Sequence, residues 1–335
     1  MERKQRLPVV AVVSCFALVW TAGCASAGKA GGPQAGVRGD RTAPIRGCFG
    51  TYDGEPRGAD GRVDISRLLD ELADLRVNTY NWLIWHGPND WDDLRRFLPL
   101  ARKQGIRVWV TLVPPSESPP HTKQYSEPFR LDYERWAREI ARLGLREPNL
   151  VAWSIDDYAH NLTVYTPEQM RRIREAAGEN PRLLFVPCLY FRQVTSQFAG
   201  DYRGLFDGVL FPYRHDSGKA NLTDASRVEY EVARVREVVG PDVPVIIDVY
   251  VTKHARLEDS TPEYVSQVMQ AGRRCADGVL AYCHQKRGTP KYDVLRRLFR
   301  EWAAGPWHAA GSTAGSPGAN ACLPAARNTL RGSRG

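Results

Sequence analysis

Apolar and polar positions follow two alternating patterns along residues 45–304. Short runs rich in β-branched and aromatic residues, typical of buried strands, are each followed by a longer segment with helical spacing of apolar residues. The strand-like runs are 45–52, 77–85, 106–113, 150–156, 182–190, 207–213, 243–251 and 277–284. The pattern therefore predicts eight strands, each followed by a helix.

The segments between these runs carry independent helix signals. Residues 65–75 place isoleucine and leucine on one stripe, and residues 295–302 do the same with leucine, phenylalanine and tryptophan. Thr166 and Thr261 each precede a proline, which is the arrangement of an N-cap residue followed by proline at the first helical position. These signals support the assignment of the intervening segments as helices.

Regular alternation of strands and helices predicts an α/β protein with a parallel sheet. Eight pairs within about 260 residues fit a single (β/α)8 TIM barrel, with a closed eight-stranded sheet and eight outer helices. The alternative is a doubly wound open sheet. That fold would normally bring a glycine-rich phosphate-binding turn after an early strand, and the sequence has none.

The first 24 residues have the composition of an export signal. A basic start leads into an apolar stretch and then into small residues that end at Cys24. The last four resemble a bacterial lipobox, although Thr21 stands where leucine is usual. The resemblance implies lipidation of Cys24, a membrane anchor and a cell-envelope location. The alternative is an ordinary signal peptide, which would make the protein periplasmic or secreted.

Two further segments lack apolar periodicity. Residues 25–44 are rich in Gly, Ala and Pro and are predicted to form a flexible tether, and residues 305–335 a disordered, low-complexity tail. The two ends of the chain, 1–44 and 305–335, account for +4 and +3 of the net charge of +8, which leaves +1 for residues 45–304. Because the central region is nearly neutral, the sequence argues against a nucleic-acid partner.

Cysteine and histidine positions do not form a known metal-binding pattern. The sequence contains no CxxC, HxH or HExxH spacing, so neither a metal site nor a cofactor is expected. Cys48 and Cys283 fall on the first and last predicted strands, which would be neighbours in a closed sheet. Two buried thiols are the simpler interpretation, and a disulfide is the alternative for an exported protein.

Acidic residues come at the carboxyl ends of two predicted strands, where the active sites of (β/α)8 barrels lie. Asp156 and Asp157 follow the fourth strand, and Asp248 lies on the seventh. Alternation along the strands places Asp156 and Asp248 on the inner face, with Asp157 just beyond. Paired carboxyl groups suit the cleavage of a glycosidic bond, in which one acid protonates the departing oxygen and another stabilises the developing cation.

Aromatic residues gather at the same predicted strand ends. Flat rings there can stack on the apolar faces of a sugar. The long Pro-rich connection 114–131 is expected to form one wall of the site, and within it Glu117 is a reserve acid. The predicted substrate-binding residues are Tyr52, Trp82, Trp85, Glu117, Tyr190, Tyr213, Tyr250, Tyr282 and His284.

Residues 45–304 thus resemble the (β/α)8 glycoside hydrolases. The adjacent Asp156 and Asp157 are similar to the acidic pair of the substrate-assisted hexosaminidases. That resemblance implies that Asp156 orients an acetamido group of the substrate and Asp157 is the general acid. The large retaining clan instead has Asn-Glu after strand four and Glu on strand seven. A second route therefore stays open, with Asp157 as acid/base and Asp248 as nucleophile.

Each of these acids also has a structural interpretation. Asp157 could cap the helix or loop that follows it, and Asp248 could pair with Arg46 or Arg214 in the core. The sequence as a whole predicts an exported glycoside hydrolase that acts on an extracytoplasmic poly- or oligosaccharide. A carbohydrate-binding barrel without catalysis and a barrel hydrolase of another bond type are the alternatives.

Overall fold

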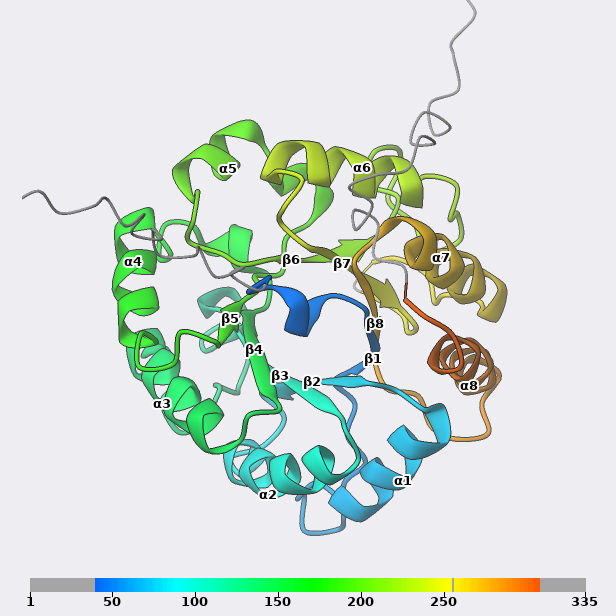
Figure 1. Cartoon of the computed structure of the whole chain (residues 1–335), viewed down its shortest axis with the longest axis horizontal. Helices are drawn as coiled ribbons and strands as arrows, with labels where there is room; N and C mark the ends of the chain where they lie inside the picture. The colour runs from blue at the N-terminus through cyan, green and yellow to red at the C-terminus, as the bar shows by residue number, and fades with distance from the viewer. Residues whose placement is uncertain (1–39, 255, 308–335) are drawn as a thin grey trace, which may run out of the picture. The chain divides into compact units, whose positions relative to one another are not determined.

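The computed structural model describes residues 40–254 and 256–307. In this part of the chain, eight parallel strands form one curled sheet, with helices around its outer side (Figure 1). The strands are β1 (Cys48–Tyr52), β2 (Thr79–Ile84), β3 (Arg107–Leu112), β4 (Leu150–Ile155), β5 (Leu184–Phe185), β6 (Val209–Tyr213), β7 (Val245–Tyr250) and β8 (Gly278–Tyr282). All eight predicted strands are found, and β5 is much shorter than expected.

Eight α-helices alternate with these strands, as the sequence predicts. They are α1 (Ile65–Leu75), α2 (Asp90–Lys103), α3 (Tyr133–Arg146), α4 (Pro167–Ala176), α5 (Ser196–Asp201), α6 (Val228–Val239), α7 (Pro262–Cys275) and α8 (Pro290–Ala303). The predicted N-caps are confirmed, because the side chain of Thr166 accepts from the Gln169 N–H and that of Thr261 from the Tyr264 N–H. Capping satisfies backbone donors that the first helical turn leaves free.

Apolar side chains form two separate cores because strand residues point alternately to the two faces of the sheet. The larger core lies between the sheet and the helices. The smaller core fills the inside of the curled sheet and includes Trp109, Leu210, Ile246 and Leu280. The inner core supports the side chains that project from the carboxyl ends of the strands.

The hydrogen-bonded strand order is β5-β4-β3-β2-β1-β8-β7-β6, so β5 and β6 are the ends of the sheet. Between them, only an isolated parallel bridge pairs Cys188 with Leu210. Leu189 N–H donates to Leu210 O at 2.9 Å, and Leu210 N–H donates to Pro187 O at 3.0 Å. Pro187 has no N–H, so it interrupts any ladder at this seam. The prediction of a closed sheet is therefore met only in part.

The chain before β1 packs against the amino ends of the strands. A short 3-10 helix, η1 (Ala43–Ile45), lies across the centre of the ring in Figure 1, and Ile45 joins the inner core. Arg46 forms an ion pair with the buried Asp277. Residues 40–44, assigned from the sequence to the tether, also contact the barrel: Arg41 Nε donates to Pro181 O at 3.1 Å, and Arg107 donates to Pro44 O at 2.8 Å. The physical reason is the apolar Ile45, which is more stable inside the sheet than in water.

Several sequence predictions lie outside the described residues. These are the export signal 1–24 with Cys24, the tether up to residue 39 and the tail from residue 308. No helix among the described residues is both long and apolar enough to cross a membrane. Cys48 and Cys283 are both free thiols, so the alternative of a disulfide between them is not realised.

Candidate active site

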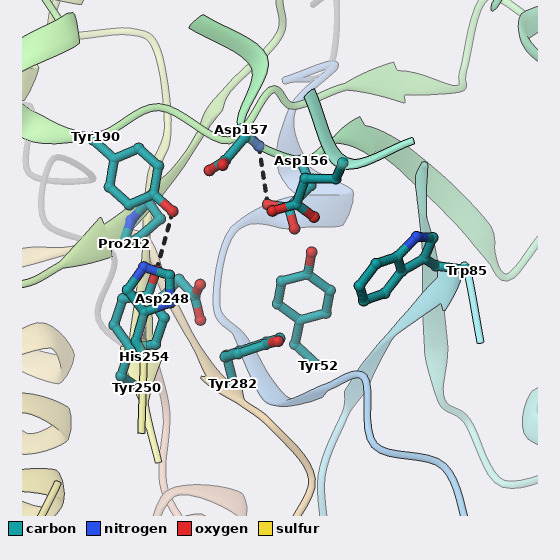
Figure 2. A pocket seen from close by; sticks show the side chains of 11 residues that line it. Tyr52, Trp85, Asp156, Asp157, Tyr190, Pro212, Asp248, Tyr250, His254 and Tyr282 are labelled. Carbon is teal, nitrogen blue, oxygen red and sulfur yellow. Dashed lines mark hydrogen bonds between the residues drawn. The ribbon is translucent and has the colours of Figure 1, made fainter. Parts of the chain in front are cut away.

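A pocket of about 260 Å³ opens at the carboxyl ends of the strands. Its lining combines carboxylic acids with aromatic rings, and Figure 2 shows these side chains directed toward a common space. The lining residues are Tyr52, Trp85, Glu117, Asp156, Asp157, Tyr190, Pro212, Asp248, Tyr250, His254 and Tyr282. The structure therefore brings together all three predicted catalytic acids and six of the nine predicted substrate-binding residues.

The adjacent acids reach this pocket because the chain turns sharply after β4. The Asp156 N–H still donates to Leu112 O of β3 at 2.8 Å, which continues the sheet by one residue. Asp157 then adopts a left-handed conformation with φ 42°, which aspartate tolerates better than most residues. Its N–H donates to Asp156 Oδ1 at 3.1 Å. No side-chain capping bond forms from Asp157, so the capping interpretation is wrong.

Asp157 is held in its ionised form by its neighbours. Its Oδ2 lies 3.4 Å from His160 Nδ1, in the 3-10 helix η3 (Tyr158–Asn161) that follows. Burial acts to raise the pKa of Asp157, but hydrogen bonds from His160 and Tyr190 outweigh it and leave the pKa below its usual value. Asp157 is therefore a carboxylate across the neutral pH range.

The pKa values of Asp156 and Glu117 are raised, in contrast to that of Asp157. Burial, followed by the negative charges of Asp157 and Glu117, raises the pKa of Asp156 well above its usual value. Burial and the charge of Asp157 raise the pKa of Glu117 to about 7. Like charges close together cannot all ionise easily, so protons stay on some members of the group near neutral pH.

The long connection after β3 places Glu117 at the pocket. Its 3-10 helix η2 (Pro115–Glu117) is tied to η3, because Asn161 Nδ2 donates to Ser116 Oγ at 2.8 Å and the Ser116 N–H donates to Asn161 Oδ1 at 3.1 Å. Farther along, Ser126 Oγ donates to Ile84 O at 2.6 Å. The predicted wall of the site is thus anchored to the elements on both sides.

Asp248 lies deep in the pocket, on the inner face of β7. It is 3% exposed, and its Oδ1 has no hydrogen-bond partner among the described residues. Burial raises the pKa of Asp248 to about 8. The core ion pair considered from the sequence is not formed, because Arg46 pairs with Asp277 and Arg214 pairs with Asp216. Asp248 is therefore available to a bound molecule.

Aromatic rings from β1, β7 and β8 pack edge to face beside these acids. The ring of Tyr282 lies 5.1 Å from that of Tyr52 and 5.7 Å from that of Tyr250, centre to centre. The Tyr190 and Tyr250 hydroxyl oxygens are 3.1 Å apart, and Arg214 lies 4.1 Å over the Tyr190 ring. These contacts fix the rings before any ligand binds, which lowers the entropic cost of binding.

Three residues predicted to bind substrate lie elsewhere. Trp82 is fully buried on the outer face of β2, with its ring centre 5.1 Å from that of Phe97 of α2. Tyr213 also faces outward, and its hydroxyl donates to Asp224 O at 2.8 Å. Both are one residue out of phase with the inner face, because successive strand side chains point to opposite faces.

His284 is the third displaced residue. Its Nδ1 lies 3.1 Å from Thr51 Oγ1, and its Nε2 lies 2.9 Å from Glu71 Oε2 of α1. The prediction extended the alternation of β8 to His284, but the strand ends at Tyr282. His284 therefore links β1 to α1 and does not line the pocket.

Two pocket residues and one neighbour are absent from the predicted site residues. Pro212 precedes Tyr213 on β6 and has the inward phase, which the alternation rule could have identified. His254 lies 3.4 Å from the Tyr250 hydroxyl, and burial lowers its pKa. His160 stands three residues after Asp157, a spacing that allows contact within one helical turn.

A separate cluster could hold a metal ion. Asp53, Glu55 and His86 place one ligand atom each within 4.8 Å of one another, at the ends of β1 and β2. Within the group, His86 Nε2 lies 2.6 Å from Asp53 Oδ1. Arg57 lies 3.6 Å from Glu55 Oε2, and both carboxyl oxygens of Glu55 are buried without a hydrogen-bond partner among the described residues. Burial and the charge of Asp53 raise the pKa of Glu55 to about 8. The sequence prediction of no metal stays a prediction.

No protein-family model matches the sequence, and no curated protein matches it. Solved structures do match the fold. GH5_18 from Streptomyces cattleya, in complex with GlcNAc, is 16% identical with a TM-score of 0.55, over 77% of this chain and 80% of that one. A glucosidase from Croceicoccus marinus is 15% identical with a TM-score of 0.54, over 77% and 68%. The endo-beta-1,4-glucanase Xac0029 from Xanthomonas axonopodis pv. citri is 9% identical with a TM-score of 0.51, over 77% and 99%. At these identities the likeness establishes a shared (β/α)8 fold.

Proposed function

We propose that the protein is a glycoside hydrolase that cleaves O-glycosidic bonds of a poly- or oligosaccharide by carboxylate catalysis. The observation that carries the proposal is the opposite protonation of neighbouring acids in one aromatic pocket. Asp157 is kept ionised, while Asp156 and Glu117 keep protons near neutral pH. Glycoside cleavage needs one acid of each kind. The fold of the glucosidase and glucanase neighbours adds support.

In the proposed mechanism, Glu117 is the proton donor to the departing oxygen. Its pKa of about 7 is close to neutral pH, where a group can both donate a proton and take one back. Asp157 is the carboxylate that stabilises or attacks the sugar cation. This assignment reverses the role that the hexosaminidase resemblance gives to Asp157, because a group with a lowered pKa is a poor acid.

Asp156 is proposed to orient the substrate and to keep its negatively charged neighbour in place. Asp248 is a poor nucleophile at neutral pH, since its pKa of about 8 leaves it protonated. The route that uses Asp248 as nucleophile is therefore less favoured than the one through Asp157. Tyr52, Trp85 and Tyr282 would provide the stacking surface for the sugar ring.

Hydrolysis of aryl glycosides and polysaccharides by the native protein and by Asp157→Asn tests the proposal. We expect turnover in the native protein and a loss of about 10³-fold or more in the variant, a size typical of an essential active-site carboxylate. Unchanged turnover in the variant would reject a catalytic role for Asp157. Saturable sugar binding without turnover in the native protein would favour a carbohydrate-binding barrel. Cleavage of esters or amides would favour a hydrolase that acts on another type of bond.

Export to the cell envelope is a further part of the proposal. It rests on residues 1–24, where a basic start, an apolar stretch and small residues precede Cys24. Growth with a radiolabelled fatty acid should label the native protein and leave Cys24→Ser unlabelled. Label on neither protein would contradict the lipid anchor, and the mature N-terminus would then locate the cleavage site of an ordinary signal peptide.

A further inference from the structure

The charges that line the pocket are unbalanced. Four of its eleven lining residues are carboxylic acids, namely Glu117, Asp156, Asp157 and Asp248, and none of the eleven is lysine or arginine. A neutral sugar can use these acids as hydrogen-bond partners, but it brings no positive charge to balance them. A sugar acid would bring a negative charge next to the ionised Asp157 and three further acids, with no lysine or arginine in the lining to neutralise it, which is unfavourable in a partly desolvated site.

The nearby basic residues do not correct the imbalance. Arg214 is committed to Asp216, with a 3.0 Å contact, and to the face of Tyr190. Burial and the charge of Arg214 lower the pKa of His254, so this imidazole is neutral. His160 interacts with Asp157. The acid deepest in the pocket, Asp248, has no cationic partner among these residues.

Asp248 and Tyr52 offer unused hydrogen-bonding atoms to a ligand. Asp248 Oδ1 and the Tyr52 hydroxyl are both buried without a partner among the described residues, and both side chains line the pocket (Figure 2). Burying the unpaired Oδ1 of Asp248 is unfavourable, and more so when the carboxyl is charged. A ligand that brings a cation would relieve this cost.

Resting on the proposed glycosidase function, we infer that the sugar bound in this pocket is an amino sugar with a free primary amine, whose ammonium group contacts Asp248. An ammonium donates three hydrogen bonds and carries the charge that the lining lacks. An N-acetylated sugar has neither property at this position, and its acetyl group needs extra room in a pocket of about 260 Å³. The substrate would then be a partly or fully deacetylated, cationic poly- or oligosaccharide.

Calorimetric titration with glucosamine and galactosamine, their N-acetylated counterparts, and glucose and galactose tests this inference. We expect at least one amino sugar to bind ten times or more tightly than its acetylated and neutral counterparts, and to lose that advantage in 0.5 M salt. Asp248→Asn should remove the advantage while leaving weak binding of the neutral sugars. Glu168→Gln, which neutralises an exposed acid on α4, should behave as the native protein.

Equal or tighter binding of the acetylated or neutral sugars, or no binding of any of the six, would overturn the inference. So would an equal loss for all sugars in Asp248→Asn, since a general packing defect would explain it. Aryl glycosides of the same sugars separate this inference from the proposed function. Cleavage of neutral glycosides alone would reject the inference of an amino-sugar substrate and support the proposed glycosidase function. Selective binding of the amine without cleavage of any glycoside would reject the glycosidase and keep the amine-binding pocket.

Discussion

His160 Nδ1 lies 3.4 Å from Asp157 Oδ2, and this contact joins the carboxylate proposed to act on the sugar to the imidazole one helical turn later. The hydrogen bond raises the pKa of His160 and is the main influence that lowers the pKa of Asp157 against burial. Both shifts have the sign of a pair that favours imidazolium and carboxylate. The protonation of the site is therefore set partly by a residue outside the pocket lining.

Replacing His160 with Asn should move the acidic limb of the pH–rate profile to higher pH. Without the imidazole, the pKa of Asp157 rises, so a larger fraction of Asp157 is protonated and inactive at low pH. We expect a greater loss of kcat/KM at pH 4.5 than at pH 7. His121→Asn, at an exposed position in the connection after β3, is the matched control. An equal loss at every pH would assign His160 a purely structural role.

Replacing Glu117 with Gln should reduce activity in a way that depends on the leaving group. A proton donor matters most when the departing oxygen is basic, so we expect a loss of about 10²–10⁴-fold on alkyl glycosides and a much smaller loss on dinitrophenyl glycosides. Steady-state kinetics on both substrates measures this difference. Glu127→Gln is the control, because Glu127 belongs to the same connection but pairs with Arg130. Similar losses on the two substrates would contradict the acid role.

Much of the fold could be predicted from the sequence because its causes are local. The spacing of apolar residues sets helix or strand, and threonine before proline sets two helix starts. Strand alternation also identified the inward direction of Asp248, Tyr250 and Tyr282. The same rule, applied to β2 and β6, excludes Trp82 and Tyr213 from the inner face. Those two predictions are wrong because they group aromatic residues without considering which face of the strand each side chain occupies.

Other features depend on contacts between distant segments. His284 leaves the expected face because β8 ends at Tyr282, and the position of a strand end is not encoded in the alternation itself. The proton on Glu117 depends on Asp157, which approaches it only after η2 and η3 pack together. The interruption at the β5–β6 seam depends on Pro187, which meets Leu210 only in the folded chain.

Asp248 should make the stability of the protein depend on pH. Its pKa of about 8 in the folded state is above the usual value of an aspartate, so between about pH 4 and 8 the folded protein holds a proton that the unfolded chain has lost. Stability from this group is present at low pH and is lost as pH rises toward 8. Asp248→Asn removes the titration and should therefore raise Tm more at pH 8 than at pH 5.

Thermal unfolding of the native protein and of Asp248→Asn at the two pH values measures this effect. Asp156 also has a raised pKa, so the variant should show a weaker pH dependence but not a flat one. Glu168→Gln should shift Tm equally at both pH values, since its side chain is 79% exposed. An equal gain at pH 5 and pH 8 in Asp248→Asn would mean that Asp248 is ionised in the folded protein.

Substitutions of Trp82 and Trp85 should affect stability and sugar binding separately. Trp82 lies on β2, and Trp85 comes three residues later, just after the strand. Trp82 packs under α2 and is fully buried, so Trp82→Ala should lower the free energy of unfolding by about 3–5 kcal/mol and leave KM unchanged. Trp85 lines the pocket, so Trp85→Ala should weaken sugar binding by roughly 3- to 10-fold with a smaller effect on stability. Denaturant unfolding and substrate kinetics on each variant test both expectations, and Trp82→Phe provides a milder change if the alanine variant does not fold. A raised KM in Trp82→Phe would show that the outer face of β2 takes part in sugar binding. An unchanged KM in Trp85→Ala would show that the sugar does not bind against Trp85.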